Sequence, residues 1–255
     1  MKKIISLQNT EIKAVAGLAK ANNRQEQNRF IAEGNRVCSA LVASNMQLEM
    51  LYVTFSMLPQ AISFCPNEKI TEVSEDVMKK ISLSHSPSGI LGIFSIPARP
   101  QPSELSEGIV LLEVSDPGNA GTLIRSCAAM GKKTVVFVDG VDPWHPKVIQ
   151  SCAGSIGLVN VFQLPWEQLL AIKNNLKLCA LVVQGGKKSN EINFSDILFV
   201  IGNEAHGIPK NKLEQCDYKL TLEMPGNVES LNAAIAGSIA LYFAWNAKNN
   251  HPINN

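Results

Sequence analysis

The sequence contains no closely spaced cysteine pair, no long apolar run and no strong excess of either charge. The six cysteines are scattered without a CxxC motif, so we expect neither a metal site nor a redox motif. The first residues lack the apolar core of a signal peptide, and no segment is apolar for long enough to span a bilayer. A net charge of +1 does not by itself indicate a nucleic-acid binder. We therefore expect a cytoplasmic protein with reduced thiols and no membrane partner.

The remaining composition is that of an ordinary globular protein. The chain has 255 residues, of which 45% are hydrophobic and 18% charged, and this length suits one large domain or two modest ones. Proline and polar residues concentrate in PARPQPSELSEG at residues 97–108, and such a stretch is typical of a linker. The sequence therefore predicts a first domain over residues 1–98, a linker over 99–107 and a second domain over 108–255.

The first domain is predicted to be small and α/β. Residues 9–43 have a helical pattern, 49–55 read as a strand, 69–82 as a strand followed by a helix with Ser74 as its N-cap, and 88–97 as a buried strand. The first 40 residues carry seven basic and three acidic side chains, an excess of four. That excess either meets phosphates or forms a solvated helical face, and composition alone favours the second.

Short apolar, β-branched runs dominate the second domain. Each is bounded by Gly, Pro, Asp or Asn, as expected for buried parallel strands. The runs cover residues 108–115, 133–139, 158–164, 178–184 and 196–202, and helical segments cover 120–131, 145–157, 165–177 and 230–248. The last of these helices is almost wholly apolar, so it must be covered by the core or by a partner subunit.

The first candidate functional region is DPGNAGTLIRSCAAMG, residues 116–131. DPGN is a turn sequence, and we expect a helix from about Ala120 that carries an isolated arginine, Arg125. The glycine spacing does not match the Rossmann fingerprint, and no Lys-Ser/Thr pair completes a Walker motif. Taken alone, Arg125 is equally well explained by an ion pair with Glu113 or Asp116.

The second region follows the strand at 196–202. Its turn contains Glu204 and His206, and ligands of open α/β sheets bind beyond the carboxyl ends of the strands. Glu204 could instead cap the next helix or pair with a lysine, and an ordinary loop role is the preferred interpretation of His206.

The third region is a strand from residue 220, the turn MPGN, and then Ser230 and Asn232 before the closing helix. Either could cap that helix, which would leave the other available to a ligand.

Taken together, the three regions resemble a known family. Their patterns are Asn119-x-Gly121-x-x-x-Arg125, Gly202-Asn203-Glu204-x-x-Gly207 and Met224-x-Gly226-x-x-x-Ser230-Leu231-Asn232. In this order they resemble the three motifs of the SpoU, or TrmH, family of RNA 2′-O-methyltransferases over residues 108–246. RFIAEGNRVCSALVAS and SHSPSGILGIFSIP also look like the ribosomal-protein-like RNA-binding domain of its rRNA-modifying, RlmB-like branch.

The resemblance implies a fold and a reaction. The expected fold is α/β: a C-terminal parallel-sheet methyltransferase domain with a deep, SPOUT-type trefoil knot, preceded by the small α/β RNA-binding domain. The knot would form the S-adenosylmethionine pocket, and the domain would work as a homodimer with the closing helix in the interface. The expected reaction is methylation of a ribose 2′-hydroxyl of RNA. The expected substrate is 23S rRNA, because the shorter tRNA enzymes of the family usually lack the first domain.

The resemblance also assigns site residues, with no metal among them. The expected catalytic residues are Arg125, Asn119, Glu204, Ser230 and Asn232. Arginine is a poor base, so Arg125 would orient the hydroxyl and stabilise charge rather than remove the proton. The expected cofactor-binding residues are Val183, Gln184, Gly185, Ile201, Gly202, Leu222, Met224, Leu231 and Ala234. The expected RNA-binding residues are Lys13, Arg24, Arg29, Arg36 and Lys147.

Two positions depart from the family pattern. Ala205 replaces a more common glycine, and Gln150 replaces a common basic residue, which removes a possible phosphate contact although Lys147 is nearby. The alternatives are the same reaction on tRNA, or a non-catalytic RNA-binding ribosome-assembly factor. The presence of every motif residue argues against the second, and the failed glycine spacing weakens a dinucleotide-dependent oxidoreductase. The target nucleotide is not indicated.

Overall fold

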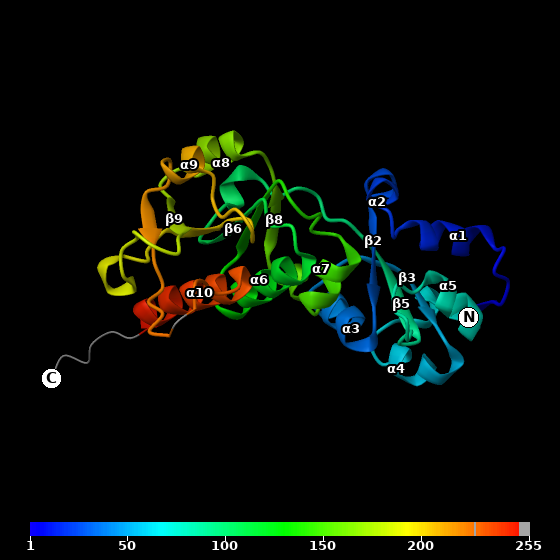
Figure 1. The fold of residues 1–255 in the computed structure, drawn as a ribbon. Helices are drawn as coiled ribbons and strands as arrows, with labels where there is room; N and C mark the ends of the chain where they lie inside the picture. The colour runs from blue at the N-terminus through cyan, green and yellow to red at the C-terminus, as the bar shows by residue number, and fades with distance from the viewer. Residues whose placement is uncertain (227, 250–255) are drawn as a thin grey trace. The chain divides into compact units, whose positions relative to one another are not determined.

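The computed structural model describes residues 1–226 and 228–249, which form two compact units (Figure 1). The first unit contains Met1–Ala98 and Asp142–Gly157, and the second contains Arg99–Val141 and Leu158–Asn255. The sequence-based boundaries place residues 142–157 in the second domain, whereas in the structure they pack with the first unit. In the described part of the chain, no helix is long and apolar enough to cross a membrane.

A five-stranded mixed sheet forms the centre of the first unit. The strands lie in the order β1 (Lys2–Ile4), β4 (Ile70–Val73), β3 (Leu48–Val53), β5 (Ile90–Ser95) and β2 (Arg29–Glu33). The pairs β1/β4 and β4/β3 are parallel, whereas β3/β5 and β5/β2 are antiparallel. The accompanying helices are α1 (Thr10–Gly17), α2 (Ala21–Gln27), α3 (Asn35–Ala43), α4 (Leu58–Ile62), α5 (Glu75–Ile81) and α7 (Pro146–Ser151).

The prediction of helix throughout residues 9–43 is wrong, because β2 interrupts it. Asn28 ends α2 in the left-handed conformation at φ 52°, and Gly34 precedes α3 at φ 95°. Between them, Phe30, Ile31 and Ala32 are buried in succession. Three consecutive buried residues fit a strand covered on both faces better than one face of a helix. The predicted cap of α5 is confirmed, because Ser74 Oγ accepts the Val77 N–H at 3.3 Å.

The segment at residues 142–157 packs into the first unit through polar and apolar contacts. Arg24 is only 1% exposed, and its guanidinium donates to Asp142 Oδ2 from two nitrogens, at 2.6 and 3.0 Å. The rings of Phe30 and Trp144 lie 5.0 Å apart between centroids. A Cβ at Gly154 would lie 2.7 Å from the Ala40 side chain, so α3 approaches too closely for a larger residue.

A six-stranded parallel sheet forms the centre of the second unit. Its order is β11 (Tyr218–Leu220), β9 (Lys177–Leu181), β10 (Ile197–Ile201), β6 (Gly108–Leu112), β7 (Thr134–Val138) and β8 (Asn160–Gln163). The predicted parallel α/β architecture of this domain is thus confirmed. The strand predicted from residue 220 instead ends there. Because all strands run the same way, the loops that follow β6, β9, β10 and β11 leave the same edge of the sheet.

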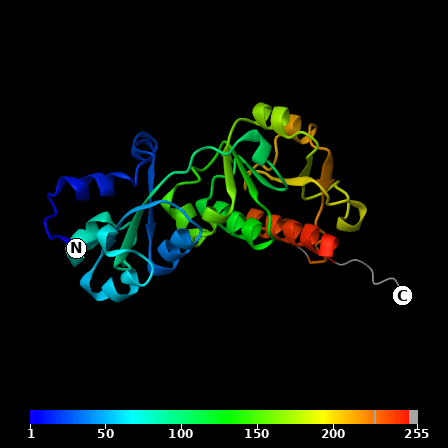
Figure 2. The ribbon, with the colours of Figure 1, turned by 180° about the vertical axis from the view of Figure 1, so that it is seen from behind.

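The longest helices of this unit are α6 (Pro117–Ala129) and α10 (Ala233–Asn249), accompanied by α8 (Trp166–Ile172) and α9 (Lys210–Leu213). Figure 2 shows α6 and α10 side by side. Gly237 permits this approach, since a Cβ there would lie 2.4 Å from Leu123 Cδ2. Ser126 Oγ and Ser238 Oγ, 2.7 Å apart, add a hydrogen bond between the helices. The packing brings the first turns of the two helices together at the carboxyl edge of the sheet.

Candidate active site

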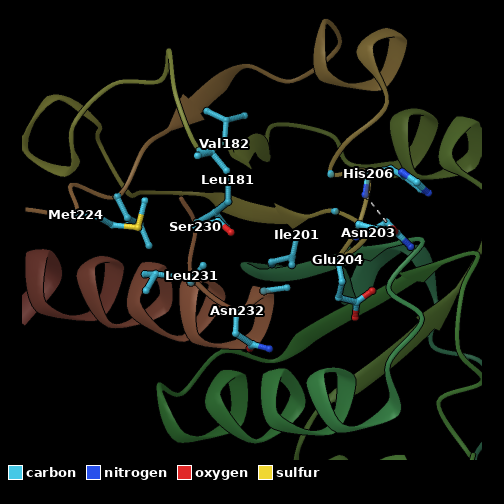
Figure 3. Close-up of a pocket in the computed structure, with 17 residues that line it drawn as sticks. Leu181, Val182, Ile201, Asn203, Glu204, His206, Met224, Ser230, Leu231 and Asn232 are labelled. Carbon is cyan, nitrogen blue, oxygen red and sulfur yellow. Dashed lines mark hydrogen bonds between the residues drawn. The ribbon is translucent and has the colours of Figure 1, made fainter. Parts of the chain in front are cut away.

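A cavity of about 600 Å³ opens at the carboxyl edge of the parallel sheet (Figure 3). Its walls come from the ends of β9 and β10, the turn at residues 202–207, residues 222, 224 and 230–232, and the start of α10. Volumes of this size are typical of small-molecule sites. The lining residues are Leu181, Val182, Val183, Ile201, Gly202, Asn203, Glu204, Ala205, His206, Gly207, Leu222, Met224, Ser230, Leu231, Asn232, Ala233 and Ala236.

Glu204 joins the turn after β10 to the loop after β6. Its carboxylate accepts the N–H and hydroxyl of Ser115 at 3.2 and 3.0 Å, the N–H of Asp116 at 3.2 Å and Asn119 Nδ2 at 3.0 Å. Partial burial would raise the pKa of Glu204, but the bonds from Asn119 and the backbone outweigh it and lower the pKa to about 2. Within the described residues it neither caps a helix nor pairs with a lysine, so both alternative roles are excluded there.

Asn119 and Asn232 extend this network between two helices. Asn232 Nδ2 donates to Asn119 Oδ1 at 3.0 Å, while Asn232 Oδ1 accepts the N–H groups of Ala234 and Ile235 at 2.9 and 3.2 Å. Asn232 is therefore the N-cap of α10. The expected start of α6 near Ala120 is three residues late, because Asp116 caps this helix and Asn119 lies in its first turn.

Asn203 and the glycines give the turn at 202–207 its shape. Asn203 Oδ1 accepts the N–H groups of Ala205 and His206, and its Nδ2 donates to the carbonyl of Glu113 at 2.9 Å. A Cβ at Gly202 would lie 2.5 Å from the backbone of Gly207. Ala205 fits this turn with its side chain exposed. These contacts fix the backbone conformation of the turn that contains Glu204.

Ser230 and His206 also line the cavity, but their side chains form no hydrogen bond in this network. With Asn232 as the cap, Ser230 is the second polar group expected at the start of α10, and it makes no side-chain hydrogen bond to a described residue. The ring of His206 is exposed and directed away from Ser230 and Met224 (Figure 3). Ser230 is therefore the better placed of the two to meet a ligand.

Arg125 is exposed on α6 and does not line the cavity. Its guanidinium has no hydrogen bond or ion pair with any described residue. Glu113 instead pairs with Lys212 at 2.9 Å, and Asp116 caps α6. The ion pairs considered as alternatives are absent from the described chain, and the charge of Arg125 is available to a substrate.

Most of the expected cofactor residues lie around the cavity. Six of the nine line it, namely Val183, Ile201, Gly202, Leu222, Met224 and Leu231. Gln184 and Gly185 lie beyond the lining in the loop after β9, and Ala234 is buried in α10. Sequence reasoning missed Leu181, Val182, Ala233 and Ala236, because small and aliphatic residues in a strand or helix carry no signal that separates a cavity wall from a core.

The expected RNA-binding residues have different environments. Arg24 is buried and paired with Asp142, so its assignment as an RNA contact is wrong. Arg29 is 45% exposed but paired with Glu49 at 2.6 Å. Lys13, Arg36 and Lys147 are exposed, and their side chains form no hydrogen bond or ion pair with the described residues. Gln150 is also exposed on α7. The described residues contain no cluster that could hold a metal ion.

The second unit is therefore a parallel α/β domain with a cavity and a polar network at the carboxyl edge of its sheet, the place where open α/β sheets bind ligands. Residues 108–242 match the SpoU rRNA Methylase family, and residues 9–92 match the MRM3-like substrate binding domain. The first match covers more than half of the chain. The chain therefore belongs to the SpoU rRNA Methylase family, as its three motifs predicted.

Relatives and solved structures agree with this assignment. The 23S rRNA (guanosine(2553)-2′-O)-methyltransferase RlmP of Bacillus subtilis is 29% identical over 250 residues, covering 95% of this chain and 98% of its own. An uncharacterized tRNA/rRNA methyltransferase of Synechocystis is 29% identical over 260 residues, covering 94% of this chain and 92% of its own. The AdoMet-bound rRNA methyltransferase of Sinorhizobium meliloti has the same fold, with a TM-score of 0.84 at 23% identity over 98% and 99% of the chains. A crystallised RNA 2′-O ribose methyltransferase has a TM-score of 0.79 at 26% identity, and the match covers 96% of this chain and 99% of that protein. The prediction of an RNA methyltransferase is confirmed.

Proposed function

We propose that this chain transfers a methyl group from S-adenosylmethionine to a ribose 2′-hydroxyl of 23S rRNA. The observation that carries the proposal is the network of Glu204, Asn119 and Asn232 beside the cavity, because it unites residues of all three motifs. The relatives support the reaction, since RlmP and the Coxiella burnetii protein RlmB, 31% identical over 143 residues, are both named as 23S rRNA 2′-O-methyltransferases.

The cavity suits the cofactor in size and in chemistry. It combines aliphatic and thioether side chains, such as Ile201, Leu222 and Met224, with the exposed polar groups of Ser230 and Asn232. Apolar walls suit an adenine ring, and backbone groups of the turns can recognise its polar edge. When bound, S-adenosylmethionine would supply an electrophilic methyl group. The backbone at Ile201, Gly202, Leu222 and Leu231 would hold it.

The residues around the cavity would position the hydroxyl rather than deprotonate it. Glu204 is fully ionised at neutral pH, but four donors occupy its oxygens, so its role is to hold Asn119 and the loop before α6. Arg125 is unpaired in the described chain, and its guanidinium would orient the 2′-oxygen and its adjacent phosphate. Methyl transfer needs the nucleophile in line with the bond that breaks, so rigid positioning contributes much of the rate.

The finer features of the family belong to the same proposal. The trefoil knot would lie at the cofactor pocket, and the working unit would be a homodimer. Support for the dimer comes from α10, on which Ile235, Tyr242 and Trp245 are 52%, 48% and 42% exposed. They recur at helical spacing, and the rings of Tyr242 and Trp245 lie 5.7 Å apart. A second copy would cover this apolar face.

The test is methyl transfer to purified rRNA. We expect the protein and labelled S-adenosylmethionine to modify 23S rRNA at one ribose and to leave tRNA unmodified. Arg125→Ala should bind the cofactor in calorimetry with unchanged affinity and lose at least about 100-fold in rate, comparable to the loss of a charge-stabilising group in other enzymes. Modification of tRNA alone would reassign the substrate, and full activity of the variant would remove Arg125 from catalysis.

A further inference from the structure

Phe55 is the most exposed large apolar side chain in the described part of the chain, at 77%. It is the second residue after β3, at the start of a single helical turn, Phe55–Met57. The preceding residue, Thr54, is buried, and its N–H donates to the carbonyl of Gly89 at 2.9 Å. The backbone is therefore fixed while the ring stays in solvent. Burying a phenylalanine stabilises a fold by about 2 kcal/mol, so an exposed ring on a fixed turn needs an explanation.

The same end of the sheet carries an unpaired arginine. Figure 1 shows α3 and α4 at this end of β2 and β3, with α2 at the opposite end. Val53 pairs with Ile90 and Glu33 with Leu91, so β5 lies between the ends of β2 and β3. Arg36 follows β2 by three residues, is exposed and pairs with no described residue. Two strand spacings, about 10 Å, separate the ends of β3 and β2. Phe55 and Arg36 follow these two ends by two and three residues.

The loop before β5 completes this surface with polar groups. Residues 82–89 read SLSHSPSG, and the loop is held by Glu33, whose Oε1 accepts Ser82 Oγ at 2.7 Å and the Ser88 N–H at 3.3 Å. The nearby carboxylate is thus occupied by the loop. His85 is exposed, and its side chain makes no contact of hydrogen-bond length with the described residues. The groups that face solvent are an aromatic ring, a guanidinium, an imidazole, hydroxyls and the side chain of Leu83, which is 54% exposed.

We propose that Phe55, Arg36 and His85 form a docking surface for an unpaired segment of the RNA substrate. A flipped-out base would stack on Phe55, and Arg36 would contact a neighbouring phosphate. Sequence-tolerant recognition of unpaired RNA combines these elements, a ring for stacking and a cation for the backbone. The surface deepens the proposed function and rests on it, because it identifies unpaired nucleotides as the part of the RNA that the first unit reads.

Point variants of the full chain test the surface by RNA binding. The probes are a 23S rRNA transcript and a fully paired RNA duplex, titrated over a range of salt concentrations. Phe55→Ala should weaken binding of the transcript by about tenfold with the salt dependence unchanged, because stacking of one base is worth about that much. Phe55→Trp should bind like the wild type. Arg36→Ala should lower the slope of log affinity against log salt by about 0.7, the value for one phosphate of a single strand.

Matched controls test whether the loss of RNA binding is specific to this surface or reflects lost stability or lost apolar area elsewhere. Leu158→Ala removes another exposed apolar side chain, 52% exposed, and should change nothing. Phe55→Ala should unfold at the wild-type temperature and bind the duplex like the wild type. Equal loss on duplex and transcript, or an unchanged affinity for the transcript, would overturn the surface. If no RNA is methylated but Phe55→Ala still weakens binding selectively, the enzyme proposal fails and the surface stands.

Discussion

Asn232 Nδ2 donates to Asn119 Oδ1 at 3.0 Å, although 113 positions separate the two residues in the sequence. The bond joins the cap of α10 to the first turn of α6. Both amides have fixed orientations, because Asn119 Nδ2 donates to Glu204 and Asn232 Oδ1 accepts the Ala234 N–H. The three motifs thus act through one chain of donors and acceptors, and each residue determines the orientation of the next.

Asn232→Asp tests this chain because it keeps the cap and removes the donor. The aspartate oxygen can still accept the Ala234 N–H, so the unfolding temperature should fall by less than about 3 °C. The other oxygen would face Asn119 Oδ1, which forces the Asn119 amide to turn and directs its oxygen at Glu204. We expect methyl transfer to fall at least about tenfold, measured as kcat with saturating cofactor.

Asn232→Ala is the matched comparison, since it removes both the donor and the cap. It should lose a similar amount of activity and about 1 kcal/mol of stability as well. If Asn232→Asp were fully active while Asn232→Ala were not, capping alone would explain the residue.

The pH dependence of stability tests the environment of Glu204. Its pKa of about 2 lies below the ordinary 4.5. A lowered folded-state pKa means that the carboxylate stabilises the fold above about pH 4.5, and that this contribution is lost as the pH falls toward 2. Thermal unfolding of wild type and Glu204→Gln should therefore differ by a constant amount at neutral pH and converge in acid.

The same ionisation predicts the pH profile of the reaction. Glu204 does not titrate near neutrality, so it cannot produce a limb in the rate profile there. We expect Glu204→Gln to lower kcat without moving the profile along the pH axis. A limb near neutral pH that disappears in this variant would show that Glu204 exchanges a proton during the reaction.

The sequence was most informative where backbone patterns are strong and least informative where long-range contacts decide. Apolar runs located β6 to β10, and the motifs located Glu204 and Asn232. The pattern did not show that Asn119 links them, because a bond across 113 positions leaves no local signal. Burial of Phe30 overrode helical periodicity in β2. The cavity walls at Leu181 and Ala236 look like ordinary core residues.

Arg24 shows most clearly how tertiary structure changes the meaning of a residue. In the sequence it belongs to a basic segment, but in the structure it anchors residues 142–157 to the first unit. Arg24→Ala would leave Asp142 Oδ2 and the carbonyls of Leu18 and Ala19 without their donor, while Asp142 Oδ1 would keep the Trp144 N–H. We expect a loss of about 3 kcal/mol in urea unfolding, the usual cost of breaking a buried pair.

The exposed Lys20 supplies the control for Arg24, and Lys20→Ala should change stability by less than about 0.5 kcal/mol. A cycle with Asp142→Ala should give a coupling of more than about 1 kcal/mol. Deleting residues 1–98 is a poorer experiment, because it uncovers Trp144 and Val148, which are buried in the full chain. Equal stability of Arg24→Ala and wild type would mean that the anchor contributes nothing to the fold.

Gly237 predicts how closely activity depends on the packing of α10 against α6. A Cβ at this position would lie 2.4 Å from Leu123 Cδ2 and 3.2 Å from Ile201 Cγ1. Gly237→Ala should therefore push α10 away from α6 or displace Leu123, at a cost of about 1–3 kcal/mol, and lengthen the bond between Asn232 and Asn119. Helix propensity acts in the opposite direction, since alanine is favoured over glycine by about 1 kcal/mol.

The measurement that tests this packing is kcat, determined alongside the free energy of unfolding in urea. The double variant Gly237→Ala/Leu123→Ala should recover activity relative to Gly237→Ala, because the shorter side chain makes room for the new methyl group. If Gly237→Ala alone were more stable than the wild type and fully active, the two helices would have room for a methyl group where they cross.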